Sequence, residues 1–218
     1  MESMPRDDDQ TLRDGRRVRG EATKIRVLTA ASDLFAQRGF SGTSINDIAA
    51  VAQVKPASIY HAFGSKEGLL AAVAEAAGEE FFGLLRTIGV TGDIHTAIRT
   101  VAETFETHPR FLRLLIMLVL ERQSDSPALM AAAQQVRARG RAMVQQWLLD
   151  LAGPDISPEH QARIDDLALA LLVFWDGAFV ARQLELNATA FFDLFDKLAD
   201  FVSERIAEIR REVSAAAR

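Results

Sequence analysis

Apolar residues recur every three to four positions along most of this chain, the spacing of helices that bury one face. A first helix is expected over about residues 22–38, with Gly39 placed to end it as a C-cap. Its apolar face would comprise Ile25, Leu28, Ala31, Leu34 and Phe35. Further helices are expected near 66–87, 94–107, 109–122, 127–151, 158–185 and 190–212. No alternating strand pattern competes with them, so the chain is predicted to be all-α.

Residues 40–70 have the pattern of a helix-turn-helix, in which two short helices cross around a tight turn. Thr43 is placed to cap the first of these helices, and Pro56 suits the first turn of the second. The shared apolar positions are Ile45, Ile48, Ala49, Ala52, Val54, Ile59, Ala62 and Phe63. This pattern predicts one small core and a second helix free to enter a DNA major groove.

The other face of that second helix carries hydrogen-bonding side chains. Lys55 would reach a phosphate or a guanine edge, while Ser58 and His61 would touch bases. The Thr43 hydroxyl, at a helix N-terminus, would face a phosphate, and Lys66 would clamp a second one. The candidate DNA-binding residues are therefore Thr43, Lys55, Pro56, Ser58, Tyr60, His61 and Lys66.

A family resemblance rests on the same residues. The run from Gly39-Phe40 through Thr43-Ser44-Ile45 to Ile48-Ala49, followed by Ile-Tyr-x-x-Phe-x-Ser-Lys-Glu over residues 59–67, resembles the DNA-binding domain of the TetR (tetracycline repressor) family. The resemblance is dense over about residues 24–70. It implies a homodimeric transcriptional regulator, most often a repressor, whose Tyr60 contacts phosphate and whose C-terminal helices hold a small ligand. It also implies a palindromic double-stranded operator, from which the ligand releases the dimer.

The chain departs from the family pattern at Gln53, where the turn usually has Gly, and at Lys55, Ala57 and Ala62. The usual Gly indicates a positive φ at position 53, where a residue with a Cβ costs roughly 1 kcal/mol. The other three departures concern which DNA sequence is read.

The net charge of −5 argues at first against a nucleic-acid partner, but its distribution reverses that conclusion. Between Leu12 and Lys66, nine Lys or Arg residues face four Asp or Glu residues. Only the local field matters at the phosphates, because salt screens charge beyond about 10 Å. Residues 1–19 are expected to be a flexible arm, which is either a solvated tail or a segment that lays its arginines along the DNA backbone or in the minor groove. Residues 20–66 would then be the DNA-binding domain and 67–218 the ligand-binding and dimerisation domain.

The last two long helices carry broad apolar faces with more aromatic surface than one neighbour requires. The resemblance implies that this pair of helices forms a two-fold four-helix dimer interface. The expected interface residues are Leu171, Ala178, Phe191, Leu194, Phe195, Leu198, Phe201 and Val202. The alternative is that all of these residues pack inside one subunit.

A ligand pocket between the middle helices would be apolar and aromatic. Its candidate residues are Phe105, His108, Met117, Trp147, Phe174, Trp175 and Phe179, each of which could equally be ordinary core. The few polar groups favour a hydrophobic or aromatic ligand. Asp176 and Arg182 could anchor one polar end of it, or could simply be solvated.

Other function classes find little support. The chain has no cysteine and no catalytic, phosphate-loop or dinucleotide motif, and its four histidines lack ligand spacing, so neither enzyme activity nor a metal or cofactor is expected. No apolar run approaches the roughly 20 residues of a membrane span. With no signal peptide visible, a cytoplasmic location is expected. The alternative function is a helical dimeric interaction protein with weak or no specific DNA binding.

Overall fold

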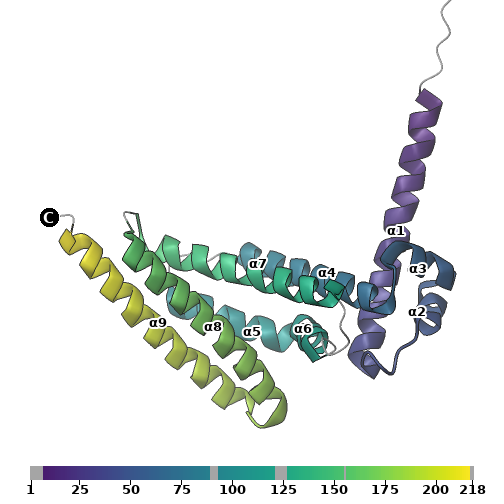
Figure 1. Cartoon of the computed structure of the whole chain (residues 1–218). Helices are drawn as coiled ribbons and strands as arrows, with labels where there is room; N and C mark the ends of the chain where they lie inside the picture. The colour runs from purple at the N-terminus through teal and green to yellow at the C-terminus, as the bar shows by residue number, and fades with distance from the viewer. Residues whose placement is uncertain (1–6, 89–92, 121–126, 155, 217–218) are drawn as a thin grey trace, which may run out of the picture. The chain divides into compact units, whose positions relative to one another are not determined.

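The computed structural model describes residues 7–88, 93–120, 127–154 and 156–216 and, for residues 7–17, 19, 88, 128 and 216, only the backbone. This part of the chain is helical throughout, without a strand, as expected. The helices are α1 (Asp7–Arg38), α2 (Ile45–Ala52), α3 (Pro56–Phe63), α4 (Lys66–Ile88), α5 (Ile94–Thr107), α6 (Arg110–Leu120), α7 (Pro127–Ala152), α8 (Pro158–Leu184) and α9 (Ala188–Ala216) (Figure 1). Residues 1–6 of the expected arm and the end of the helix expected over 109–122 lie outside the described residues.

The chain divides into two compact units. One, here called the head, comprises residues 1–76 and 114–133; the other, the body, comprises residues 77–113 and 134–218. The sequence-based division at residue 66 thus differs from the observed one. The first turns of α4 bury Leu69, Leu70 and Val73 within the head, and these apolar side chains explain why the head extends beyond its third helix.

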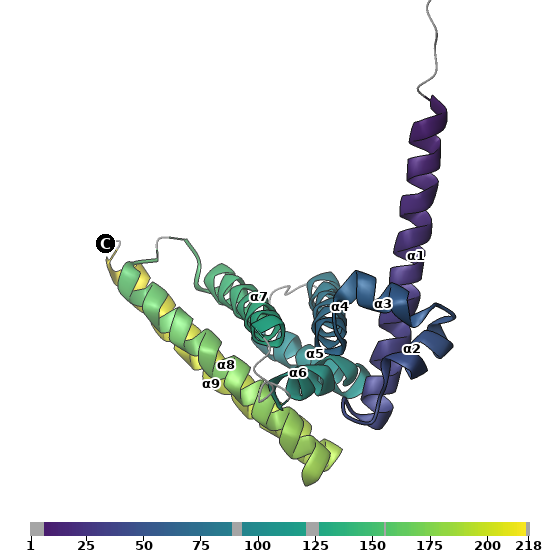
Figure 2. The same cartoon turned by 45° about the vertical axis from the view of Figure 1, so that its right-hand side comes forward.

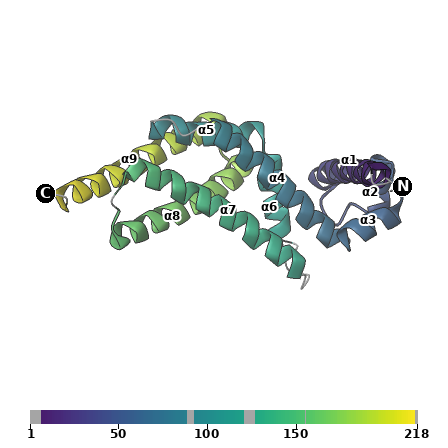
Figure 3. The same ribbon diagram turned by 90° about the horizontal axis from the view of Figure 1, so that it is seen from above.

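Helices α2 and α3 pack beside α1, as Figures 1 and 3 both show. The core of these three helices consists of Val27, Ala30, Ala31, Leu34, Phe35, Ile45, Ile48, Ala49, Ala52 and Ile59. Two expectations for this core are wrong. Ile25 is 62% exposed and Ala62 is also exposed: the buried stripe of α1 runs through Val27 and Ala30, and Ile59 is the one residue of α3 that is fully buried.

Helix α1 begins at Asp7, well before the expected start near residue 22. The expected arm is therefore helical over residues 7–19. No proline interrupts the chain between Pro5 and Pro56, and Gly15 and Gly20 each cost a helix only about 1 kcal/mol, so neither residue needs to end it. An apolar stripe signals where a helix packs, but not how far the helix extends past the packed region.

A capping box starts α2. The backbone N–H of Asp47 donates to the Ser44 hydroxyl oxygen at 3.1 Å, and the backbone N–H of Ser44 donates to the Asp47 carboxylate at 3.0 Å. Hydrogen bonds from the Ser44 hydroxyl, and then from its backbone N–H, hold the pKa of Asp47 below its ordinary value. The residue that caps α2 is therefore Ser44, and the expectation that Thr43 would cap it is wrong. Ser65 and Ser157 cap α4 and α8, since their hydroxyl oxygens accept from the backbone N–H groups of Gly68 and His160.

Gln53 ends α2 in the left-handed region, with φ 55° and ψ 48°. Its backbone N–H lies 3.3 Å from the carbonyl oxygen of Ala50, and the backbone N–H of Val54 donates to the carbonyl oxygen of Ala49 at 3.0 Å. The positive φ expected from the sequence is confirmed. Among the described residues that are not glycine, no other backbone adopts it. The turn geometry that aims α3 is therefore kept despite the strain of a side chain.

The body is described by itself. Helices α8 and α9 run side by side as an antiparallel pair (Figures 1 and 2), and α5 packs along α9. Arg99 of α5 pairs with Asp196 of α9 at 3.1 Å, and Arg137 of α7 pairs with Asp176 of α8 at 2.7 Å. Aromatic rings fill the centre: Phe81 stacks on Phe105 and on Phe111, with ring centroids 5.6 Å and 4.8 Å apart. No helix in the described ranges is both long and apolar enough to cross a membrane.

The strained turn generates a stability prediction. Gln53→Gly removes the steric cost of a Cβ at positive φ, so the free energy of unfolding should rise by about 0.5–1 kcal/mol after allowing for the entropy of glycine. The melting temperature should then rise by about 1–4 °C, measured by circular dichroism. Gln53→Ala keeps the Cβ and should show no such gain. A lower melting temperature for the glycine variant would refute the strain argument.

Candidate functional site

The outward face of α3 is the first candidate site. Ile59, 1% exposed, is the one fully buried residue of this helix, and Phe63 is half-buried. Ser58, His61 and Tyr60, which is 52% exposed, therefore stand on the surface as expected. Lys55 is the exposed N-cap residue, and its ammonium group has no hydrogen-bond or ion-pair partner among the described residues. Pro56 occupies the first turn, where its missing N–H costs nothing.

An open groove runs between α1 and α3. It has a volume of about 490 Å³ and is lined by Gly20, Thr23, Lys24 and Val27 from α1 and by Ser58, Ala62 and Phe63 from α3. Lys24 is exposed and brings a second cation beside Ser58. The sequence pattern does not single out Lys24, because which face of α1 adjoins α3 follows from packing. We call Lys24, Lys55, Ser58, Tyr60 and His61 together the α3 surface.

Thr43 does not belong to that surface. Its side chain is 1% exposed, and its hydroxyl donates to the carbonyl oxygen of Gly39 at 2.9 Å while lying 3.2 Å from that of Leu34. Thr43 therefore fastens the α1–α2 loop to the end of α1, and its expected phosphate contact is wrong. Lys66 is half-buried, with its Nζ 4.2 Å from the ring centroid of Phe40. This cation–π contact holds the Lys66 side chain against the head.

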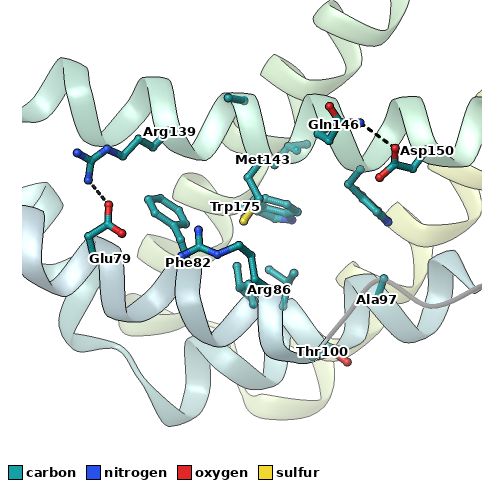
Figure 4. A pocket seen from close by; sticks show the side chains of 15 residues that line it. Glu79, Phe82, Arg86, Ala97, Thr100, Arg139, Met143, Gln146, Asp150 and Trp175 are labelled. Carbon is teal, nitrogen blue, oxygen red and sulfur yellow. Dashed lines mark hydrogen bonds and ion pairs between the residues drawn. The ribbon is translucent and has the colours of Figure 1, made fainter.

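The second candidate site is a cavity in the body, with a volume of about 580 Å³ (Figure 4). That volume suits a small organic molecule, for which pockets of about 300–1,000 Å³ are typical. Its wall is mainly apolar and comes from α4, α5, α7 and α8. The lining residues are Glu79, Phe82, Leu85, Arg86, Ala97, Thr100, Val101, Arg139, Ala142, Met143, Val144, Gln146, Trp147, Asp150 and Trp175.

The polar groups of the cavity wall differ in whether they have partners. Glu79 pairs with Arg139, and Gln146 donates to the Asp150 carboxylate at 2.8 Å, so Figure 4 shows a dashed contact toward either end of the cavity. Arg86 is exposed and has no hydrogen-bond or ion-pair partner among the described residues. The indole N–H groups of Trp147 and Trp175 are buried without an acceptor in that same part of the chain.

Of the expected ligand residues, Trp147 and Trp175 line this cavity. Phe105, Phe174 and Phe179 instead belong to the aromatic core, His108 is exposed at the end of α5, and Met117 lies in the head. The two candidate anchors serve the fold instead, because Asp176 pairs with Arg137, and Arg182 pairs with Glu106 at 2.8 Å. Burial raises the pKa of Asp176, against the opposing effect of Arg137.

Most of the expected dimer residues are packed inside the single chain and do not lie on its surface. Leu171, Ala178, Phe191, Phe195 and Val202 are buried inside the body, Leu194 and Leu198 are half-buried, and Phe201 is exposed. A different stripe of α8 faces outward, here called the outer α8 face: Leu169, Ala170, Val173, Gly177, Val180 and Leu184. Helix α8 is apolar on both sides, so its periodicity alone could not identify the face that packs against its own body.

The described residues contain no group of three or more His, Asp or Glu side chains placed to hold a metal ion. The available chemistry is therefore a cationic and hydrogen-bonding helix surface in the head, and an apolar cavity with unmatched donors in the body.

Comparison with known proteins identifies relatives of the head. Residues 27–73 match the family described as bacterial regulatory proteins, tetR family. The chain is 37% identical over 87 residues to the HTH-type transcriptional repressor Rv3405c of Mycobacterium tuberculosis, which covers 40% of this chain and 44% of that protein. It is 34% identical over 88 residues to the HTH-type transcriptional repressor KstR2 of Rhodococcus jostii, covering 40% of each. The matched region thus spans less than half the length of these relatives.

Solved structures extend the likeness to the whole fold. A transcriptional regulator from Rhodococcus sp. Rha1 superposes with a TM-score of 0.69 at 17% identity, covering 83% of this chain and 96% of the other. A transcriptional regulator from Saccharomonospora viridis, solved in complex with choline, has a TM-score of 0.62 at 18% identity, covering 83% and 95%. At these identities the likeness concerns the fold alone.

The inward position of Thr43 predicts a stability effect without an effect on DNA binding. Thr43→Val removes the hydroxyl and leaves a buried carbonyl without its donor, which should lower the free energy of unfolding by about 1–2 kcal/mol. Thr43→Ser keeps the donor and should lose less. Both proteins, once folded, should bind DNA as the unaltered chain does. A stable Thr43→Val protein with weakened DNA binding would instead support a phosphate contact by Thr43.

Proposed function

Because the head is that of the bacterial regulatory proteins of the tetR family, we propose that this chain is a DNA-binding transcriptional regulator. It acts as a homodimer on a palindromic operator, represses transcription there, and leaves the operator when a small molecule occupies the body cavity. The observation that carries this proposal is the α3 surface. It is formed mainly by a short helix whose polar side chains point outward and whose one fully buried residue is Ile59.

The α3 surface supports two kinds of DNA contact. Lys55 and Lys24 supply charge to phosphates, and Tyr60 supplies a hydroxyl, all of which position the helix without reading sequence. Ser58 and His61 present donors and acceptors to base edges. The exposed Ala57 and Ala62 are small, which allows α3 to approach the groove closely. Repression, as opposed to activation, is supported by the two relatives, both of which are described as transcriptional repressors.

The outer α8 face supports the dimer. Val173 and Leu184 are 60% and 81% exposed, and Leu169 and Val180 continue the same helical stripe. Gly177 lies within this stripe, with open space where a Cβ would stand. A second copy of α8 packed two-fold against this face would cover a stripe that water otherwise contacts. Dimerisation is also required for specificity, because one recognition helix reads too few base pairs on its own.

The body cavity supports release by an effector. It reaches α4, which begins immediately after the helix-turn-helix, so an occupant that shifts α4 would alter how the heads are presented. The two recognition helices of a dimer must be about one DNA turn apart, roughly 34–36 Å. An occupant that favours another spacing would therefore lower operator affinity by the difference in its affinity for the two states.

Selection of genomic fragments by the purified protein tests DNA binding. We expect recovery of a short palindrome, with Tyr60→Ala and Lys55→Ala each weakening binding about tenfold or more. Lys55→Ala should also reduce the slope of log affinity against log salt by about 1, because one phosphate contact is lost. Lys197→Ala, an exposed lysine of α9, is the matched control and should change neither quantity.

Two other outcomes would count against this proposal. Recovered DNA fragments that share no sequence motif, with binding weakened equally by Lys55→Ala and Lys197→Ala, would indicate only a general attraction to phosphate. No recovery at all would favour a helical interaction protein without specific DNA binding.

Charge on the outer α8 face should separate the subunits. Val173→Glu places a carboxylate in the proposed interface, where burial without a partner is strongly unfavourable, so the protein should sediment as a monomer at micromolar concentration. Val119→Glu changes an exposed valine of α6 in the head and should leave the dimer intact. Dimeric Val173→Glu protein would place the interface elsewhere.

A further inference from the structure

We infer that the occupant of the body cavity is an organic carboxylate with an aromatic or acyl body, whose carboxylate binds Arg86. This inference rests on the proposed effector role of the cavity and specifies the chemistry that the cavity selects. It depends on two features of the wall: its apolar surface and the partners of its charged groups.

Most of the wall would contact an apolar molecule. Phe82, Leu85, Val101, Met143, Trp147 and Trp175 contribute large apolar side chains from four helices. Figure 4 shows the sulfur of Met143 beside the Trp175 ring, with Phe82 further along the same cavity. An aromatic ring or a medium-length acyl chain would replace water along these side chains, which favours binding.

The charged side chains of the wall are not equivalent. Glu79 is paired with Arg139, and Asp150 accepts a hydrogen bond from Gln146 one turn before it on α7. Arg86 has neither kind of partner within the described residues. Figure 4 places it between the two ends, close to Phe82 and below Met143 and Trp175. A carboxylate is the natural counter-ion here, because the planar guanidinium donates two parallel hydrogen bonds to it.

The remaining unmatched groups are also donors. Trp147 and Trp175 each have a buried indole N–H without an acceptor in the described structure, and both side chains belong to the cavity wall. Unpaired buried donors are rare in folded proteins and destabilise the state that contains them. Both nitrogens are closed off from solvent, so a ligand oxygen would reach them only if the indole rings turned, and the carboxylate is assigned from Arg86 alone.

Aromatic walls can also hold a quaternary ammonium group by cation–π attraction. Two observations favour the anion in this chain. Arg86 lies within the cavity wall and would repel a cationic ligand. Of the two wall carboxylates, Glu79 is paired with Arg139, and Asp150 accepts a hydrogen bond from Gln146 at the other end of the cavity (Figure 4). Choline is therefore the discriminating alternative ligand.

The chain itself provides a reporter of occupancy. It contains two tryptophans, Trp147 and Trp175, and both line this cavity, so tryptophan emission reports the site directly. The full-length protein is titrated with 4-phenylbutyrate and octanoate, with the neutral amides of the same two acids, and with choline. We expect saturable emission changes for the acids, at concentrations about tenfold or more below those for the amides. Amides that bind as well as the acids, tighter binding of choline, or no saturable change with any probe would overturn the inference.

Variants of Arg86 identify the group responsible. Arg86→Gln should remove the preference for acid over amide while leaving amide binding unchanged, and Arg86→Lys should retain part of it, because the charge remains without the planar fork. Arg141→Gln, an arginine of α7 outside the cavity, is the matched control and should keep the full preference. A preference unchanged in Arg86→Gln would refute the assignment. Circular dichroism of each variant checks that the helices are intact.

Operator binding is measured separately from the fluorescence. Acids that bind but do not release DNA would leave this inference standing and refute release by the effector. Operator binding that persists while no acid binds would support the regulator and refute the inference.

Discussion

The burial of Ile59 is the contact on which the functional surface depends. It is the only residue of α3 packed fully into the head, so this side chain determines which way the eight-residue helix faces. Successive helix residues are separated by about 100°, and a rotation by one position would turn Tyr60 or Ser58 inward. The left-handed turn at Gln53 maintains this orientation from one end, and Gly64 with φ 77° does so from the other. The polar face of α3 is exposed because its one large aliphatic side chain is not.

The body meets a different constraint, since α8 has to be apolar on two sides. One side, with Leu171, Trp175, Ala178 and Phe179, packs among the helices of its own subunit. The other, the outer α8 face, remains exposed in the single chain. Ion pairs such as Arg137–Asp176 and Arg182–Glu106 fix the rotation of α8 about its axis, because each joins it to a different neighbouring helix. The cavity uses the inner side of the same helix through Trp175, so the proposed dimer contact and effector site share one rigid element.

Most structural features of the head could be predicted from the local sequence. The apolar spacing of α2, the glycine after α1 and the family pattern at Gln53 each predicted a feature that the structure contains, because capping, turn conformation and local packing depend on near neighbours in sequence. The exposure of Lys55, Ser58, Tyr60 and His61 was predicted for the same reason, since a helix of known register exposes what it does not bury. Thr43 failed because the capping hydroxyl belongs to the adjacent Ser44, and two neighbouring hydroxyls satisfy the same local pattern.

Tertiary packing decided the rest. Sequence could identify Trp147 and Trp175 as candidate wall residues, but not the arginine beside them, because Arg86 carries no signal until α4, α5, α7 and α8 converge around it. It could identify α8 and α9 as strongly apolar, but not which face of α8 is covered by its own subunit, because both faces repeat with the same period. The sequence alone thus determined where most of the helices lie, the left-handed turn at Gln53 and the exposed side of α3, all of which follow from local chemistry. The cavity and the outward stripe of α8 follow from which distant helices meet, and that only the folded chain decides.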